Sequence, residues 1–418
     1  MKYRSRLVDR ELTLRLASTG AVVIEGPRAC GKTATGRQRA VSEALLDVDE
    51  QARLAVAVDP ALVLAGDTPR LIDEWQVEPS IWNHIRSAVD ERARPGQFIL
   101  TGSAVPADDV TRHTGAGRLT RLRMRPMSLF ETGLATGAVS LRALLDGVPP
   151  RCPAAGHTVG NVADWIAVGG WPGHLQRALT SAEAWRANRD YLDEIRRVDL
   201  PRVDGANRDP NRIGRLLRSL ARNVATQASV ATMAADAGGA DAALKAHTAQ
   251  AYLSALARLM IVEDQPAWTP HLRSRATLRS TPKRHFVDPS LAVSALRATP
   301  DRLLGDLNLL GLFFESLVVR DLRIYAQAND SEVLHYRDNT GLEVDAVVQA
   351  ADGRWAAFEI KLGPGRVDEG ARNLLKFAER VDQAACGAPS ALAVIVAVGY
   401  GYERPDGVGV LPITALGP

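Results

Sequence analysis

Residues 21–33 read AVVIEGPRACGKT, and they combine the residue types that proteins use to bind phosphate. The apolar, β-branched run at 21–24 predicts a buried strand of a parallel sheet, and the segment 32–38 predicts a helix. Between them lies G-x-x-x-x-G-K-T, which is typical of a P-loop when it stands in the order strand, loop, helix. In such a loop, backbone N–H groups converge on the phosphates, the lysine neutralises β and γ charge, and the threonine hydroxyl ligates Mg²⁺.

The loop therefore predicts a site for a nucleoside triphosphate with Mg²⁺. Lys32 is the predicted catalytic lysine and Thr33 a predicted metal ligand, and the alternative is a chance match in an unrelated turn. The predicted nucleotide-binding residues of this stretch are Gly26, Pro27, Arg28, Ala29, Cys30, Gly31, Lys32, Thr33 and Ala34.

Hydrolysis needs acids beside the phosphates, and the segment 70–76, RLIDEWQ, supplies two at the end of a second strand. Asp73 is expected to hold the water shell of Mg²⁺, and Glu74 to polarise the attacking water. The alternative is an exposed acidic pair at a strand end. A third strand at 97–100 ends in T-G-S, so that Thr101 is expected to hydrogen-bond the water or the γ-phosphate.

Residues 115–126 alternate leucine and arginine, which predicts a strand with one basic face. Arg118 is a candidate for stabilising transition-state charge, either in its own chain or across a subunit boundary. A solvated basic strand is an equal alternative.

Together, these sequence motifs and their order resemble the AAA-type ATPase domain of a widespread prokaryotic family of P-loop ATPases. The resemblance implies adenine as the base, with ATP and Mg²⁺ as cofactors, a helical lid, and a C-terminal domain of unknown function with a restriction-endonuclease-like core. The segments that carry it are GPRACGKT at 26–33, LIDE at 71–74, LTGS at 100–103, GR at 117–118, PMSLFE at 126–131 and GGWP at 169–172.

Near the C-terminus, Asp345 and then Glu359-x-Lys361 reproduce the D…E-x-K arrangement of restriction-like nucleases, the PD-(D/E)xK pattern. A strand has a period of two residues, so Glu359 and Lys361 project from one face, with Asp345 on the neighbouring strand. The acids are predicted to bind Mg²⁺, with Glu315 from a preceding helix completing the shell, and Lys361 to position or deprotonate a water. The alternative is a structural ion cluster without cleavage.

Between these parts, the pattern helix, turn, helix, strand over residues 227–263 has the order of a winged helix. Lys245, Thr248 and Gln250 are candidates for contacts in a DNA major groove, and protein contact is an equal alternative. A basic loop follows, with Arg273, Arg275, Arg279, Lys283 and Arg284.

An arginine-rich stretch runs from residue 186 to residue 222. Four of its arginines recur at three- and four-residue steps and so share one helix face. A solvated face is the usual explanation, and phosphate contact is the alternative. These four are Arg212, Arg215, Arg218 and Arg222.

The composition of the chain limits which partners and which cellular compartment are expected. The chain has 418 residues, with 51 basic and 48 acidic side chains, so any nucleic-acid surface must be local. Three scattered cysteines form no disulfide framework or zinc spacing, which favours a reducing compartment. The first residues lack a signal-peptide pattern and no stretch is long and apolar enough to span a membrane. A cytoplasmic α/β protein is expected, with no membrane partner.

The predicted domains are a P-loop AAA-type core at 1–135, a helical lid at 136–222, a winged-helix-like module at 223–300 and a restriction-endonuclease-like α/β domain at 301–418. We expect an ATPase whose nucleotide state controls a C-terminal effector directed at nucleic acid, with DNA favoured over RNA and a homo-oligomer formed through the ATPase domain. The alternative is a nucleotide-dependent switch or scaffold with a catalytically silent nuclease-like domain. A small-molecule kinase is disfavoured, since no acceptor-binding motif is present.

Overall fold

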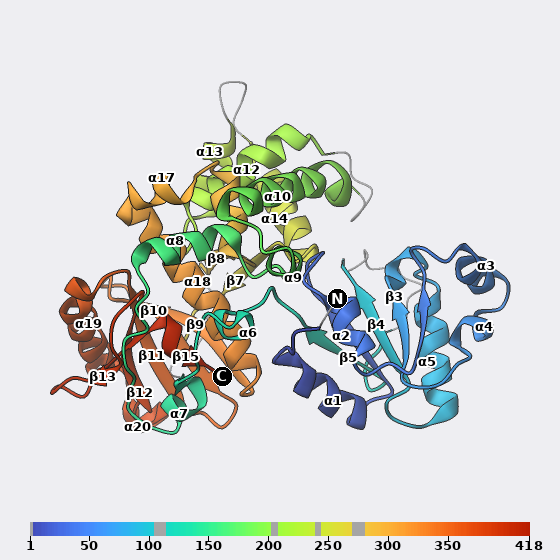
Figure 1. Ribbon diagram of the computed structural model, residues 1–418, viewed down its shortest axis with the longest axis horizontal. Coiled ribbons are helices and arrows are strands. Elements are labelled where there is room, and N and C mark those ends of the chain that lie inside the picture. The colour runs from blue at the N-terminus through green and yellow to red at the C-terminus, as the bar shows by residue number, and fades with distance from the viewer. Residues whose placement is uncertain (1–2, 104–113, 202–207, 239–243, 270–280) are drawn as a thin grey trace. The chain divides into compact units, whose positions relative to one another are not determined.

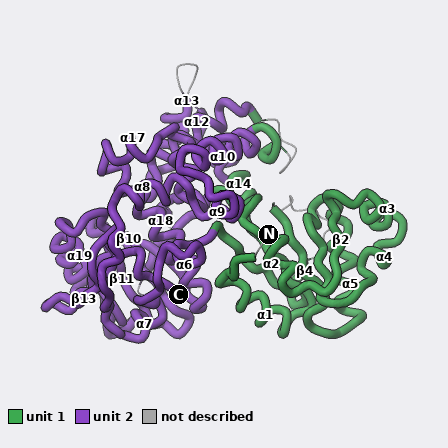
Figure 2. Tube along the Cα trace, viewed as in Figure 1, with its two compact units in different colours: residues 1–126, 197–208, 254–261 green, residues 127–196, 209–253, 262–418 purple. Residues whose placement is uncertain are grey.

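The computed structural model describes residues 3–103, 114–201, 208–238, 244–269 and 281–418 (Figure 1). The chain divides into two compact units (Figure 2). Unit 1 contains residues 1–126, 197–208 and 254–261, and unit 2 contains residues 127–196, 209–253 and 262–418. The unit boundary thus falls at Met127, whereas the predicted ATPase core extended to residue 135.

Unit 1 is built on a five-stranded parallel sheet in the order β2-β3-β4-β1-β5. Its strands are β1 Ala21–Glu25, β2 Ser42–Leu45, β3 Arg70–Asp73, β4 Phe98–Gly102 and β5 Leu119–Arg123. Its helices are α1 Val8–Ser18, α2 Lys32–Arg37, α3 Glu50–Val58, α4 Pro60–Leu64 and α5 Ile81–Arg92, with a 3₁₀ turn at Trp75–Val77. Because β4 lies between β1 and β3, the carboxyl ends of these three strands meet along one edge.

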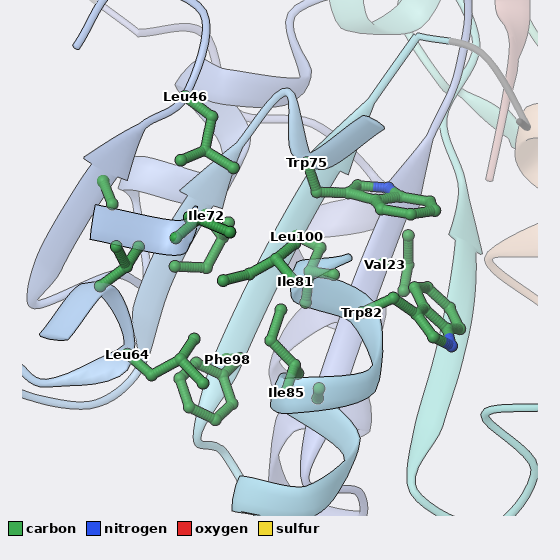
Figure 3. Close-up of a cluster of buried hydrophobic side chains, with 14 of the residues drawn as sticks. Val23, Leu46, Leu64, Ile72, Trp75, Ile81, Trp82, Ile85, Phe98 and Leu100 are labelled. Atoms are coloured by element: carbon green, nitrogen blue, oxygen red, sulfur yellow. The ribbon is translucent and has the colours of Figure 1, made fainter. Parts of the chain in front are cut away.

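The central strands β1, β3 and β4 of this sheet are buried on both faces, which is why their sequences are mostly apolar. Val22 and Ile24 face the side covered by α1, where they pack with Leu12. Val23 faces the opposite side and packs with Trp82 and other side chains of α5 (Figure 3). The period of two along β1 therefore sends alternate side chains into two separate cores.

Unit 2 carries a six-stranded mixed sheet in the order β13-β14-β12-β11-β10-β9. Strands β9, β10 and β11 are antiparallel neighbours, and β11, β12 and β14 are parallel. Helix α18 precedes β9 and packs against β9 to β11, and α19 connects β11 to β12. The bounds are α18 Leu307–Gln327, β9 Ser331–Arg337, β10 Glu343–Ala350, β11 Trp355–Lys361, α19 Val367–Arg380, α20 Gln383–Cys386, β12 Ala391–Val396, β13 Tyr402–Glu403 and β14 Gly409–Pro412.

The rest of unit 2 is mostly helical, with two small strand pairs, β6 with β15 and β7 with β8. The helices are α6 Leu129–Thr132, α7 Leu141–Leu145, α8 Val159–Val168, α9 Pro172–Gln176, α10 Ser181–Glu194, α12 Pro210–Arg222, α13 Val230–Gly238, α16 Pro289–Ala295 and α17 Pro300–Leu304. Helix α14 Ala246–Arg258 and a π-helical turn at Ile195–Asp199 each have residues in both units. The strands are β6 Val139–Ser140, β7 Val262–Gln265, β8 Lys283–Phe286 and β15 Leu416–Gly417.

Many helices of unit 2 begin where the sequence places a cap. Thr180 and Glu183 form a reciprocal capping box at the start of α10, and Asp-Pro pairs start α12 and α16. These side chains satisfy N–H groups that the first helical turn leaves without partners. No helix among the described residues is both long and apolar enough to cross a membrane.

A buried ion network joins distant segments of unit 2. Arg320 of α18 lies 2.8 Å from Asp288 and 2.7 Å from Asp321, and both carboxylates are fully buried. Asp321 accepts a hydrogen bond from the backbone N–H of Leu129, and Asp288 accepts one from Gly170. The two motifs PMSLFE and GGWP are therefore anchored to α18 and to the start of α16.

Candidate functional site

The glycine-rich loop forms between β1 and α2, as the sequence predicts. Gly31 has φ 101°, a conformation that favours glycine, and it caps α2. The backbone at Gly26 lies so close to the segment after β5 that a Cβ atom on Gly26 would lie 2.3 Å from the carbonyl oxygen of Met124. Both glycines of the motif are thus required by backbone geometry.

Lys32 is folded back onto its own loop. Its Nζ donates to the carbonyl oxygens of Gly26 and Pro27, each at 3.0 Å, and the side chain is almost fully buried. A lysine that rests on neutral carbonyl groups can exchange these contacts for phosphate oxygens, which carry more charge. Its position at the loop is the one the sequence predicts.

Two hydroxyls and a carboxylate meet at the carboxyl edge of the sheet. Thr33 Oγ1 donates to Asp73 Oδ1 at 2.8 Å, and Thr101 Oγ1 donates to the same oxygen. Burial raises the pKa of Asp73, and these two hydroxyls oppose that effect. The structure therefore brings together the predicted metal ligands Thr33 and Asp73 with the predicted nucleotide contact Thr101. Their oxygen atoms fit the preference of Mg²⁺ for hard ligands.

Glu74 follows Asp73 and is held by side chains from two elements. Its backbone has φ 52°, in the left-handed region, and Ser103 Oγ donates to Glu74 Oε2 at 3.1 Å. Gln76 Nε2 donates to the same carboxylate oxygen. Gln76 was not predicted, although its place two residues after the acid is a signal that could have found it. The two partners fix the carboxylate in one orientation.

Arg6, in the segment before α1, forms hydrogen bonds that hold the P-loop in place. The sequence analysis does not predict this contact. Arg6 donates to the carbonyl oxygens of Cys30 at 3.0 Å and Arg125 at 2.7 Å, and its side chain is buried. No motif marks an arginine that binds backbone carbonyls 24 residues away. Cys30 is itself buried, so its side chain supports the loop from within. Arg28 pairs with Asp199 at 3.0 Å and is half exposed.

Arg118 does not reach the loop of its own chain, so the predicted role in cis is wrong. It immediately precedes Leu119, which pairs with Ala21 at the start of β1, whereas the P-loop follows the end of β1. At roughly 3.3 Å per residue, Arg118 lies about 15 Å from that edge. It forms an exposed pair with Asp90 at 2.8 Å. The predicted strand at 115–126 is also shorter than expected, Leu119–Arg123.

In unit 2 the D…E-x-K residues come together as predicted. Glu359 and Lys361 share one face of β11, and their side chains are 2.5 Å apart. Asp345 lies at a register shift between β10 and β9, and its Oδ2 accepts from the N–H of Ile360 at 2.8 Å and lies 3.9 Å from Lys361 Nζ. Asn373 of α19, which was not predicted, donates to Glu359 at 2.7 Å.

The predicted metal shell of Glu315, Asp345 and Glu359 is not assembled, because a lysine ammonium takes its centre. Lys283 of β8 lies 2.7 Å from Glu315, 2.9 Å from Glu343 and 3.4 Å from Asp345, and it is almost fully buried. Among the described residues, no group of three or more His, Cys, Asp or Glu is arranged to hold a metal ion. Sequence reasoning had placed Lys283 in a basic loop.

We call Glu315, Glu343, Asp345 and Glu359 the acidic cluster. Burial opposes charge on Lys283, but the carboxylates outweigh it and raise the pKa of this lysine. Burial raises the pKa of Glu315 to about 8 and that of Glu359 to about 7, against the effect of the paired lysines. Four carboxylates face two ammonium groups, and the repulsion among the carboxylates opposes the ionisation of all four at once. The cluster borders a cavity of about 700 Å³.

The middle segments differ in part from the sequence interpretation. Helices α13 and α14 and the strand β7 follow in the predicted order, but β7 begins at Val262, because α14 continues to Arg258 and Met260 turns the chain with φ 58°. For the loop at 169–173, a lid over the nucleotide and a structural turn with a buried tryptophan are equal expectations. Trp171 is buried within unit 2, and its Nε1 donates to Ser290 at 3.0 Å. Arg273, Arg275, Arg279 and Arg202 lie outside the described residues.

Three family models match the chain. Residues 18–133 match an AAA domain. The segment that holds the glycine-rich loop is therefore similar to an AAA domain. Residues 160–302 match a domain of unknown function (DUF8612), and residues 310–416 match another domain of unknown function (DUF4143).

Similar proteins extend across most of the chain. Uncharacterized proteins of Mycobacterium tuberculosis and Mycobacterium bovis are each 26% identical to it over 345 residues, which is 81% of this chain and 70% of theirs. A Walker-type ATPase of Pyrococcus abyssi superposes with a TM-score of 0.40 at 13% identity, covering 69% of this chain and 94% of that one.

Proposed function

We propose that unit 1 binds ATP with Mg²⁺ and hydrolyses it. The observation that carries this proposal is the convergence of Thr33 and Thr101 on Asp73. Asp73 ends β3, and only β4 separates β3 from β1, the strand that leads into the P-loop. An enzyme that cleaves a phosphoanhydride needs positioned charge more than covalent chemistry, and this edge of the sheet offers an ammonium, two hydroxyls and two carboxylates.

Each residue has a distinct role in this proposal. Lys32 leaves the carbonyl oxygens of its loop and contacts the β- and γ-phosphates. Glu74, oriented by Gln76 and Ser103, accepts a hydrogen bond from the attacking water and draws charge onto its oxygen. Mg²⁺ bound near Thr33 and Asp73 would neutralise phosphate charge.

The experiment is a phosphate-release assay on the purified full chain with ATP and Mg²⁺. We expect turnover that needs Mg²⁺ and is lost in Lys32→Ala. If the chain releases phosphate at the same rate with Lys32→Ala, hydrolysis occurs elsewhere and the proposal fails.

We further propose that the nucleotide state of unit 1 controls unit 2, whose role is directed at nucleic acid, with DNA favoured. The support is the D…E-x-K arrangement on β10 and β11, with helices α13 and α14 before the β7–β8 pair, in the order of a winged helix. Assembly of several copies through the ATPase domain is part of this proposal, because a neighbouring chain could then supply the arginine that Arg118 does not supply in cis.

One observation favours the alternative, in which unit 2 is a catalytically silent interaction domain. Lys283 fills the centre of the acidic cluster, where a nuclease would hold its metal. Incubation of supercoiled plasmid with the full chain, ATP and Mg²⁺ distinguishes a nuclease from a catalytically silent domain. Intact plasmid supports the silent domain, and cutting that disappears in Lys361→Ala supports a nuclease.

A further inference from the structure

A second cavity in unit 2 is lined largely by arginines. It has a volume of about 640 Å³ and is lined by residues of α10 and α12 and of the segment at the end of α16. This volume is within the range of small-molecule sites. Its arginines are Arg189, Arg196, Arg215, Arg218 and Arg297.

The charge around this cavity is strongly unbalanced. Asp193 is the acid among its lining residues, so five guanidinium groups face one carboxylate, a balance of 5 − 1 = +4. Asp193 pairs with Arg196 at 2.9 Å, and Arg189 pairs at 3.2 Å with Asp190, which lies outside the lining. Among the described residues, Arg218 and Arg297 form no ion pair. Guanidinium groups gathered at this density repel one another unless an anion lies between them.

Two buried donors at the cavity lack partners. The Nε atom of Arg196 and the Nε1 atom of Trp185 are both buried, and neither has a hydrogen-bond partner among the described residues. Buried N–H groups are satisfied in nearly all proteins, so each unmet donor indicates a ligand or an ordered water. Both side chains line the cavity.

The surrounding structure holds these groups in place. Gly214 lies inside α12, where glycine costs helix stability, but a Cβ atom there would be 2.9 Å from Arg196 Nη1. Arg189 stacks 5.3 Å from the ring of Trp185, and Arg215 donates to the carbonyl oxygen of Ala237 at 2.8 Å. Groups oriented in advance lose little entropy when they bind a ligand.

We propose that this cavity binds a compact ligand that carries two or more phosphate groups. Two phosphate groups bring about three to four negative charges. This matches an excess of +4 among the lining residues, or 5 − 2 = +3 when Asp190, the partner of Arg189, is counted. Guanidinium groups bind phosphate through paired N–H donors, and the indole N–H adds a neutral donor that fixes orientation. The proposal is independent of the nucleotide site in unit 1.

Pyrophosphate is the probe, and the test uses the full chain with Lys32→Ala so that the P-loop contributes no binding. Isothermal titration should show saturable binding. Arg196→Gln should weaken it about tenfold or more, and Trp185→Phe about 2- to 10-fold, because the first removes a charge-assisted donor and the second a neutral one. Arg212→Gln, on α12 beside the cavity-lining Arg215 but outside the cavity, should leave the affinity unchanged.

Three outcomes would overturn the proposal. These are the absence of saturable binding by protein whose circular dichroism matches the parent, an equal loss in Arg212→Gln, and undiminished binding in both Arg196→Gln and Trp185→Phe. A single-stranded oligonucleotide that binds where pyrophosphate does not would also refute a compact ligand and indicate a nucleic-acid backbone.

Discussion

Thr33 and Asp73 are 40 positions apart in the chain, yet the hydroxyl of the first donates to the carboxylate of the second at 2.8 Å. This bond joins the P-loop helix to the strand that ends in the acidic pair. It requires β1 and β3 to run parallel in one sheet with only β4 between them. The nucleotide site is therefore a property of the sheet order rather than of the glycine loop alone.

Glu74→Gln should separate binding from hydrolysis. The amide keeps the shape of the side chain and its place beside Ser103 and Gln76, but it polarises water weakly. We expect ATP affinity within a few-fold of wild type and a turnover rate lower by about 10²- to 10⁴-fold. Steady-state phosphate release and calorimetry would measure both, with Glu78→Gln as the control. Unchanged turnover would assign the base to another residue.

Lys283→Met should destabilise unit 2. The ammonium balances Glu315, Glu343 and Asp345, and its removal leaves buried carboxylates without a partner. We expect a loss of about 3–5 kcal/mol in the free energy of unfolding. Urea unfolding of the full chain would measure it, with the exposed Lys376→Met as the matched control. A loss below about 1 kcal/mol would mean that the cluster does not depend on this lysine.

Arg320→Met tests the ion network that anchors the GGWP and PMSLFE segments. Asp288 and Asp321 are fully buried, and both pair with this guanidinium. Breaking a buried pair from one side should cost about 3–5 kcal/mol, and we expect the midpoint of urea unfolding to fall accordingly. Arg302→Met, an exposed change, should leave the midpoint in place. Equal behaviour of the two variants would contradict the anchoring role.

The buried histidines of unit 2 should contribute less to its stability as the pH falls, whereas Glu315 and Glu359, whose pKa values burial raises, contribute in the opposite direction. Burial lowers the pKa of His335 to about 4, and burial also lowers the pKa values of His174 and His285. An unfolded histidine titrates near pH 6.5, so between about pH 4 and 6.5 the unfolded chain binds more protons than the folded one. Stability from His335 is therefore complete above pH 6.5 and declines as the pH falls, by at most about 3 kcal/mol.

Urea unfolding at pH 7.5 and pH 5 measures this effect. His335→Gln should lower the stability at pH 7.5 and reduce the difference between the two conditions. If the variant and the wild type lose the same amount on acidification, His335 is not among the groups responsible.

The parts of the site that the sequence predicted are those set by local patterns. A strand, a glycine loop and a helix are adjacent in the chain, and the period of two in β11 is enough to put Glu359 and Lys361 on one face. The role of Arg118 in cis could have been excluded from the sequence, because a residue before a parallel strand lies at the edge opposite to the P-loop.

The missed residues act over long sequence distances and carry no motif. Arg6 reaches backbone carbonyl groups from the segment before α1, and Lys283 enters the acidic cluster from another strand pair. Neither position differs in composition from a solvated basic residue. Only the packing of the sheets and helices shows where each cation lies.

Calorimetric titration of the full chain with ATP and Mg²⁺ tests the central claim most directly. The account predicts saturable binding of ATP with Mg²⁺ that includes a site lost in Lys32→Ala and retained in Lys245→Ala, an exposed lysine outside the loop. Absence of binding by folded wild-type protein, or equal binding by the Lys32 variant, would contradict it.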